Sequence, residues 1–316
     1  MDHKLILDWD IIVSSFSNVS YDDWKRMAEM ELNSPIDLPL HHAGHSFVPI
    51  DFDNLANFSE LSFAKPKLMC RLDLSMPKGY QHMAVAAGLE ADIFLIESEG
   101  IDLLLDDNFY HTLYTHFPDD KKTKILYYFK QQEIKNEKIL NFRAGYDVSR
   151  RPIEMVSLDF YANDYNNIER LETFAGIMKS LPKNKQKEIC WHFPADSNFV
   201  ISVATYRAAR KVWQKIFGDV PCRIGGYTSN YVANELHQNL IRCTIQAASM
   251  IIGGCDEIEI QPISITDEGY RWSINTYNLL VKESILAQAT DTVRGAPIIE
   301  NLTESIFNNV ISKIVK

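Results

Sequence analysis

The sequence predicts an α/β protein built on a parallel (β/α)8 barrel of the TIM type, with an N-terminal arm. From about residue 66 onward, short apolar runs of strand length alternate with longer segments of helical pattern. The chain of 316 residues is 46% hydrophobic, which is enough to bury a full core, and α/β barrels of this size are common as single units. We expect an arm over residues 1–60 and a barrel domain over residues 61–316 that includes the C-terminal helix.

The arm is expected to contain one short amphipathic helix. In residues 21–32, YDDWKRMAEMEL, apolar side chains recur at helical intervals, and Ser20 precedes them as a candidate N-cap. Residues 33–54 are rich in proline, histidine and aspartate without a steady period, which indicates an irregular segment. Such a segment needs a surface to lie on, because ordering each residue costs roughly 1–2 kcal/mol of backbone entropy. That surface is either the chain's own barrel or a neighbouring subunit.

Seven barrel strands are visible as apolar runs, each followed by a segment that can form a helix. They are residues 67–74, 91–98, 123–129, 153–160, 188–193, 221–227 and 256–263. A weaker eighth candidate, residues 139–146, would complete the count of a (β/α)8 barrel. The Gly-Gly pairs in IGGY and IIGGC are typical of close helix–strand packing or of a helix C-terminus rather than of a phosphate loop.

The ligand site of a parallel barrel lies at the C-terminal ends of its strands. Polar residues near those ends form the candidate ligand-binding site at the barrel mouth: Asp159, Tyr161, His192, Arg223, Tyr227, Glu259 and Gln261. Arg223 needs an anionic partner, which a ligand phosphate or carboxylate would supply, as would a structural carboxylate such as Asp159. His192 is read either as a ligand-binding residue or as a hydrogen-bonded structural residue.

Composition and missing motifs argue against several function classes. A net charge of −10, without any Lys/Arg run longer than a pair, argues against nucleic acid as a partner. The lack of a signal peptide and of any apolar run of membrane-spanning length favours a cytoplasmic protein without membrane contact. Five dispersed cysteines lack the spacing of a zinc site or disulfide framework, and Gly44 argues against a helical metal site from His41 and His45. No nucleophile elbow, phosphate loop or dinucleotide fingerprint is present.

Four segments follow one another in the order known from one family. Residues 204–213 read ATYRAARKVW, 239–263 read NLIRCTIQAASMIIGGCDEIEIQPI, 274–284 read INTYNLLVKES, and 291–306 read DTVRGAPIIENLTESI. They resemble the Ala-x-x-Arg-Ala-Ala-Arg-x-x-Trp helix and the three segments that follow it in the methylmalonyl-CoA mutase family of cobalamin-dependent acyl-CoA mutases. The expected N-terminal helix resembles that family's entry helix, so the resemblance extends over nearly the whole chain.

Departures from the family pattern point to a non-catalytic member. Catalytic chains hold the corrin in a further domain with an Asp-x-His-x-x-Gly motif, which is not found in this sequence. They also carry Gln-Thr-Ser-Gly and Leu-His-Thr-Asn stretches where this chain reads IGGYTSN and IEIQPI, with Glu259 in place of the second histidine. The resemblance is closest to the small, non-catalytic (beta) subunit. It implies that the chain alone binds no cofactor, that adenosylcobalamin belongs to a catalytic partner, and that Arg207, Arg242 and Asp291 are fold determinants.

Two functions are therefore open. The first is a small subunit that pairs with a cobalamin-binding catalytic chain, or self-associates, in acyl-CoA isomerisation and is inactive alone. The second is a stand-alone barrel protein, an isomerase or a binding protein, for an acyl-CoA or another small anionic ligand. An acyl-CoA channel needs small residues along the barrel axis, whereas the strands are rich in Ile, Leu, Trp, Phe and Tyr. If these side chains fill the channel, the subunit function is favoured.

Overall fold

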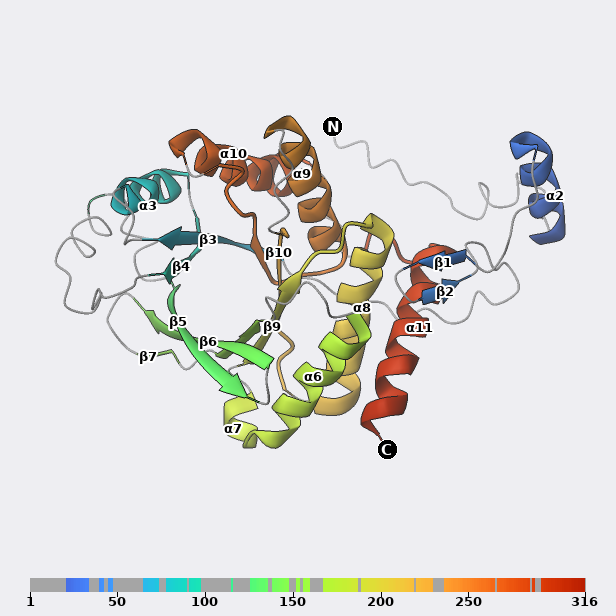
Figure 1. The fold of residues 1–316 in the computed structure, drawn as a ribbon, viewed down its shortest axis with the longest axis horizontal. Coiled ribbons are helices and arrows are strands. Elements are labelled where there is room, and N and C mark those ends of the chain that lie inside the picture. Colours follow the sequence, from blue (N-terminus) through green and yellow to red (C-terminus); the bar gives the residue numbers. More distant parts are fainter. Residues whose placement is uncertain are drawn as a thin grey trace, which may run out of the picture.

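The structure is a computed structural model of the 316-residue chain. It describes residues 21–33, 40–42, 45–47, 65–73, 78–89, 91–97, 115, 126–135, 138–147, 152–153, 156–159, 167–186, 189–218, 220–229, 236–264, 266–284, 286–287 and 291–315. Figure 1 shows helices gathered beside a twisted sheet, with the N-terminal elements set apart from it.

The elements have the following bounds in chain order. The N-terminal elements are α2 (Tyr21–Leu32), β1 (Leu40–His42) and β2 (His45–Phe47). The strands of the main sheet are β3 (Lys67–Asp73), β4 (Ile93–Glu97), β5 (Leu126–Lys135), β6 (Lys138–Asp147), β7 (Pro152–Ile153), β8 (Val156–Asp159), β9 (Ile189–Pro194), β10 (Ile224–Tyr227) and β11 (Glu257–Glu259). The helices of the body are α3 (Gly79–Gly88), α6 (Asn167–Ser180), α7 (Lys183–Gln186), α8 (Phe199–Phe217), α9 (Leu236–Ile252), α10 (Asp267–Asn278), the π-helix η1 (Leu279–Glu283) and α11 (Pro297–Ile314).

Seven strands of the main sheet run parallel. Their order is β5-β4-β3-β11-β10-β9-β8, with every neighbouring pair parallel. Each of them overlaps one of the seven runs expected from the sequence, so an α/β protein with a parallel sheet is confirmed. The first of these strands, β3, pairs with the last, β11.

The eighth candidate strand behaves differently from the expectation. Residues 139–146 lie in β6, which pairs antiparallel with β5 from Leu126↔Asp147 to Lys135↔Lys138 and meets β8 at Asn141↔Asp159. Because Lys135 and Lys138 are only three residues apart, the chain can form a hairpin here, whereas a parallel neighbour needs a crossover of about a dozen residues. Eight parallel β/α units are therefore not found in the described residues. Hydrogen-bonded pairing nevertheless runs from β5 through β6 to β8.

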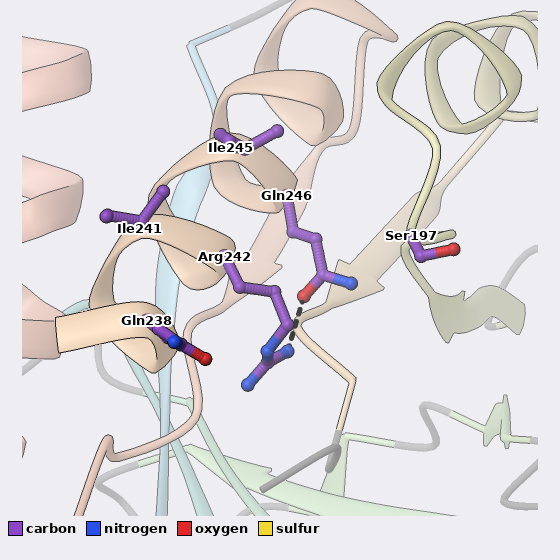
Figure 2. Close-up of a pocket in the computed structure, with 6 residues that line it drawn as sticks. All are labelled: Ser197, Gln238, Ile241, Arg242, Ile245 and Gln246. Atoms are coloured by element: carbon purple, nitrogen blue, oxygen red, sulfur yellow. Dashed lines mark hydrogen bonds between the residues drawn. The ribbon is translucent and has the colours of Figure 1, made fainter. Parts of the chain in front are cut away.

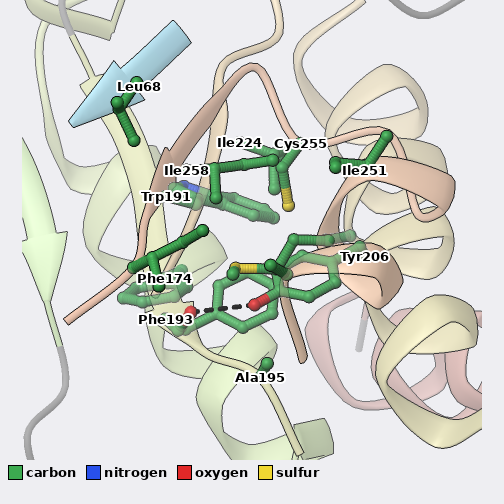
Figure 3. Close-up of a cluster of buried hydrophobic side chains, with 14 of the residues drawn as sticks. Leu68, Phe174, Trp191, Phe193, Ala195, Tyr206, Ile224, Ile251, Cys255 and Ile258 are labelled. Atoms are coloured by element: carbon green, nitrogen blue, oxygen red, sulfur yellow. Dashed lines mark hydrogen bonds between the residues drawn. The ribbon is translucent and has the colours of Figure 1, made fainter. Parts of the chain in front are cut away.

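The hydrophobic core lies between the parallel strands and helices α6, α8 and α9 (Figure 3). Alternate residues of the strands point to it, among them Leu68, Trp191, Phe193, Ile224 and Ile258. The helices supply Phe174, Tyr206 and Ile251. Tyr206 satisfies its buried hydroxyl by donating to the Phe193 carbonyl at 3.0 Å, and the two rings stack at 4.6 Å.

Helix α8 is central because most of its surface is buried. It begins at a side-chain cap, since Asn198 Oδ1 accepts hydrogen bonds from the amides of Val200 at 3.0 Å and Ile201 at 3.2 Å. It ends at Gly218, whose positive φ of 46° favours glycine. Alanines 204, 208 and 209 let α8 approach its neighbours closely, and α11 packs along it.

Close packing also explains the two Gly-Gly pairs. A Cβ added at Gly226 would lie 2.5 Å from Sδ of Met250 and 2.6 Å from the Tyr206 hydroxyl. A Cβ at Gly253 would lie 2.8 Å from Cβ of Tyr206. Gly254 ends the turn after α9 with a φ of 83°. The prediction of close packing and a helix terminus is confirmed.

The N-terminal elements match the sequence in part. The expected helix is α2, but the segment expected to be irregular contains an antiparallel hairpin of β1 and β2 in which His42 pairs with His45. Strand β2 contacts α11. Among the helices that the structure describes, none combines the length and the apolar character needed to cross a membrane.

Candidate functional site

One face of the parallel sheet carries charged and polar side chains. In register, Phe193, Gly226, Ile258 and Leu68 lie side by side and face the core, so the residues between them face the opposite way. This second face, here called the polar face, carries Arg71, Cys190, His192, Arg223, Tyr227, Glu257 and Glu259. Arg71, His192, Tyr227 and Glu259 lie toward the C-terminal ends of β3, β9, β10 and β11, where parallel sheets bind ligands. Cys190, Arg223 and Glu257 lie at or near the N-terminal ends of β9, β10 and β11, so the expectation that Arg223 stands at the barrel mouth is wrong.

Arg71 and Glu259 form the first charge pair of the polar face. Nε of Arg71 donates to Oε1 of Glu259 at 2.6 Å, and Nη2 donates to Oε2 at 3.2 Å. The Glu259 side chain is fully buried and that of Arg71 largely so, which makes this a bidentate, desolvated pair. The pKa of the nearby Cys70 thiol is raised, first by burial and then by the negative charges of the Glu259 and Asp92 carboxylates.

Arg223 and Glu257 form the second pair. Nη2 of Arg223 donates to Oε1 of Glu257, and the Cys190 thiol lies 3.9 Å from Oε2 of the same carboxylate. Glu257 is buried, while Arg223 is partly exposed. Arg223 therefore has an anionic partner within the chain, Glu257. Two guanidinium groups and two carboxylates balance each other on the polar face.

His192 and Tyr227 fill the space between the charge pairs. Both are buried, and their rings lie 5.1 Å apart. Gly225 makes room for the imidazole, because a Cβ there would lie 2.3 Å from Cδ2 of His192. The ring of His192 thus occupies the volume that a side chain on β10 would otherwise fill.

The remaining candidate residues are placed as follows. Asp159 is the last residue of β8 and pairs in register with His192. Gln261 follows β11, where its amide donates to Oγ1 of Thr228 at 2.9 Å and its carbonyl accepts from Ser273. Tyr161 lies outside the described residues. The structure thus brings His192, Arg223, Tyr227 and Glu259 together on one face.

Sequence reasoning missed Arg71 and Glu257. The available signal was alternation: the charged residues of KLMCRLD, at 67, 71 and 73, and those of EIE, at 257 and 259, all fall on one face of an otherwise apolar strand. Of the large strand residues expected to fill the barrel channel, Trp191 and Phe193 face the helices, whereas Tyr227 lies on the polar face. Trp191 packs on Trp213 with ring centroids 4.9 Å apart, and Phe193 packs on Tyr206, both on the helix side of the sheet.

The two arginines of residues 204–213 have structural partners. Arg207 donates to Asp291 at 2.6 Å and to Glu300 at 2.8 Å, so one buried guanidinium ties α8 to α11 and to the segment before it. Arg210 donates to the Gly254 carbonyl at 2.6 Å and to Asp256 at 2.9 Å. The Arg207 contacts thus fix α8 against α11, and the Arg210 contacts fix it against the connection between α9 and β11.

Arg242 lines a cavity of about 310 Å³ beside α9. The other lining residues are Ser197, Gln238, Ile241, Ile245 and Gln246, and Figure 2 shows Ser197 on the segment that leads into α8, across from the residues of α9. Ser197 follows β9, and Ser229, which contacts Arg242, follows β10. The cavity therefore lies at the carboxyl edge of the parallel sheet, but outside the polar face.

Comparison with known proteins shows a similarity in the C-terminal part of the chain. Residues 183–316 match the family model described as methylmalonyl-CoA mutase. The methylmalonyl-CoA mutase small subunit of Porphyromonas gingivalis is 28% identical over 141 residues, which cover 40% of this chain and 23% of that subunit. The probable small subunit of Mycobacterium bovis is 25% identical over 155 residues, covering 43% of this chain and 25% of the relative.

The matches are partial in length. The segment shared with each of these two relatives is about a quarter of the relative's own length, at 23% and 25%. Among solved structures, an arginine-to-lysine mutant of flavocytochrome b2 aligns with 84% of this chain and 77% of its own at a TM-score of 0.38 and 9% identity, which is too low to identify a shared fold. The arginine-rich helix, the Gly-Gly turn and the segment around Asp291 all lie within the matched residues 183–316. Over these residues the chain is similar to the methylmalonyl-CoA mutase family, and the two relatives named above are small subunits of that enzyme.

Proposed function

We propose that the chain is a non-catalytic, small-subunit-like barrel that pairs with a cobalamin-binding catalytic chain in acyl-CoA isomerisation. One observation carries the non-catalytic part: the polar face neutralises its own charges through Arg71–Glu259 and Arg223–Glu257. A site for an acidic thioester needs cationic donors aimed at the substrate. Here an incoming carboxylate or phosphate would have to displace an internal, buried carboxylate, and breaking such a pair costs about 3–5 kcal/mol.

The family residues support the same reading. Arg207, Asp291 and Glu300 satisfy one another inside the chain, where they join α8 to α11. Their retention is explained by packing without any contact to a substrate. We include Asp159, Tyr161 and Gln261 in the proposal only as residues near the strand ends, where a relict ligand site would lie.

The proposal extends to architecture and cofactor. We place the parallel strands in a (β/α)8-type barrel over residues 61–316, because β3 pairs with β11 and pairing continues from β5 through β6 to β8. Residues 1–60 serve as an arm toward the partner or the chain's own barrel. Adenosylcobalamin belongs to the catalytic partner, and the complex is cytoplasmic.

Co-purification with a catalytic methylmalonyl-CoA mutase subunit tests this function. Co-expressed with a tagged catalytic subunit, the chain should elute with it as one complex in gel filtration and carry no corrin absorbance when purified alone. The isolated chain should not isomerise methylmalonyl-CoA. Corrin absorbance retained by the pure chain, or isomerisation by it, would contradict the proposal and support a stand-alone enzyme.

One variant tests whether the polar face takes part in catalysis. Glu259→Gln keeps the shape of the side chain and removes the charge that Arg71 meets. In the assembled complex, the proposal expects kcat and KM for methylmalonyl-CoA to be unchanged, provided that the complex still elutes intact. A loss of kcat in an intact complex would place catalysis on this face and refute the non-catalytic role.

A further inference from the structure

The Arg242 pocket, the cavity lined by Ser197, Gln238, Ile241, Arg242, Ile245 and Gln246, is independent of the polar face. Arg242 lines this cavity, and its guanidinium lies beside Gln246 in Figure 2. Nη1 of Arg242 is firmly anchored: it donates to the Ser229 carbonyl at 2.7 Å, to the Ser229 hydroxyl at 3.0 Å and to Gln246 at 2.8 Å. The side chain is thereby held in a fixed direction.

The other two nitrogens of this guanidinium make weak hydrogen bonds or none among the described residues. Among the residues that the structure describes, Nη2 has contacts only at 3.5 Å, to Oδ1 of Asn239 and to Sγ of Cys243. Nε is buried without a hydrogen-bond partner among the described residues. A guanidinium binds a carboxylate through two adjacent N–H groups, and contacts of 3.5 Å are weak substitutes for such bonds. The donor edge that suits an oxyanion is thus the edge that the protein leaves least satisfied.

The charge of the Arg242 guanidinium also favours an anionic ligand. Arg71, Arg207, Arg210 and Arg223 each meet a carboxylate. Arg242, in contrast, has only neutral partners within the described part of the chain. A partly buried cation with neutral partners is incompletely compensated, which favours binding of an anion.

The isoleucines that line the pocket favour a ligand with an apolar part. Ile241 and Ile245 lie one turn apart on α9 and are 61% and 45% exposed. Both line the same cavity as Arg242, so a ligand that reaches the guanidinium from this cavity would contact them with the rest of its body. A bare inorganic anion would leave these two side chains uncovered.

We propose that the Arg242 pocket binds a small carboxylate with a short apolar body. The carboxylate oxygens accept from Arg242, and the apolar body covers Ile241 and Ile245. A volume of about 310 Å³ suits a ligand of this size and excludes a large cofactor. This inference goes beyond the proposed subunit function, because it concerns a separate cavity and needs no partner chain.

Titration calorimetry of the full-length chain at low ionic strength tests the proposal, with butyrate as the probe. We expect saturable binding of butyrate, no binding of the neutral butyramide, and weaker binding of inorganic phosphate. Arg242→Gln should weaken butyrate binding at least about tenfold, because a charge-assisted hydrogen bond is lost. The matched control is Arg271→Gln, which removes an exposed arginine of α10 outside the pocket and should leave the affinity unchanged.

A second variant guards against misfolding, since Arg242 also anchors Ser229. Ile241→Glu alters an exposed position, keeps every bond of Arg242 and places a negative charge at the pocket, so butyrate binding should again fall at least about tenfold. Absence of butyrate binding by the unaltered chain would overturn the proposal. So would equal binding of butyramide, tighter binding of phosphate than of butyrate, or an unchanged butyrate affinity in Ile241→Glu.

Discussion

Replacing Arg207 by methionine should strongly destabilise the fold. The guanidinium is 1% exposed and bonds Asp291 at 2.6 Å and Glu300 at 2.8 Å, and these side chains are themselves only 2% and 6% exposed. Methionine fills a similar volume but leaves two buried carboxylates without a cation. Removing one partner of a buried ion pair costs about 3–5 kcal/mol. We expect Arg207→Met to lower the free energy of unfolding by that amount.

Urea unfolding followed by tryptophan fluorescence measures this loss, because Trp213 lies on α8 less than two turns from Arg207. The neighbouring pair between Lys211 and Glu304 supplies the control, since it joins the same two helices one turn further along. Glu304 is 46% exposed, so Glu304→Gln should cost less than about 1 kcal/mol. A loss in Arg207→Met no larger than that of Glu304→Gln would refute a structural role for the buried network.

Three further predictions concern packing, pH and thiol chemistry. Gly226→Ala should destabilise the protein by about 1–3 kcal/mol in urea unfolding, because its Cβ would meet Met250 and Tyr206; an unchanged midpoint would contradict this contact. Burial lowers the pKa of His82 despite its contact with Asp267, so the unfolded chain binds the proton more readily than the folded chain does. The free energy of unfolding should therefore be highest above about pH 6.5 and fall below that pH. His82→Gln should make thermal unfolding differ less between pH 5.5 and pH 7.5. Burial raises the pKa of the half-buried Cys222 to about 12, so at pH 8 it should react with a disulfide reagent more slowly in the native protein than in denaturant; equal rates would contradict this raised pKa.

The sequence by itself determined the local elements. The run at residues 188–193 and its six counterparts became the parallel strands, because apolar runs of strand length bounded by helical segments specify a buried parallel sheet. Helix α2 matches residues 21–32 in full, since its apolar periodicity is contained within the helix. The Gly-Gly pairs were likewise interpretable, because a glycine reports tight packing or a positive φ at its own position.

Only the tertiary structure decided which face of each strand meets the helices and which charges meet one another. Residue alternation shows that His192 and Trp191 point apart, but not which of them faces the core. Arg71 meets Glu259 across 188 residues of sequence, and Arg207 meets Glu300 across 93. The direction of β6 also depended on how β5 turns back rather than on the composition of either strand. Local periodicity arises from neighbours along the chain, whereas these pairings arise from strands and helices that become neighbours only when the sheet and its helices have packed together.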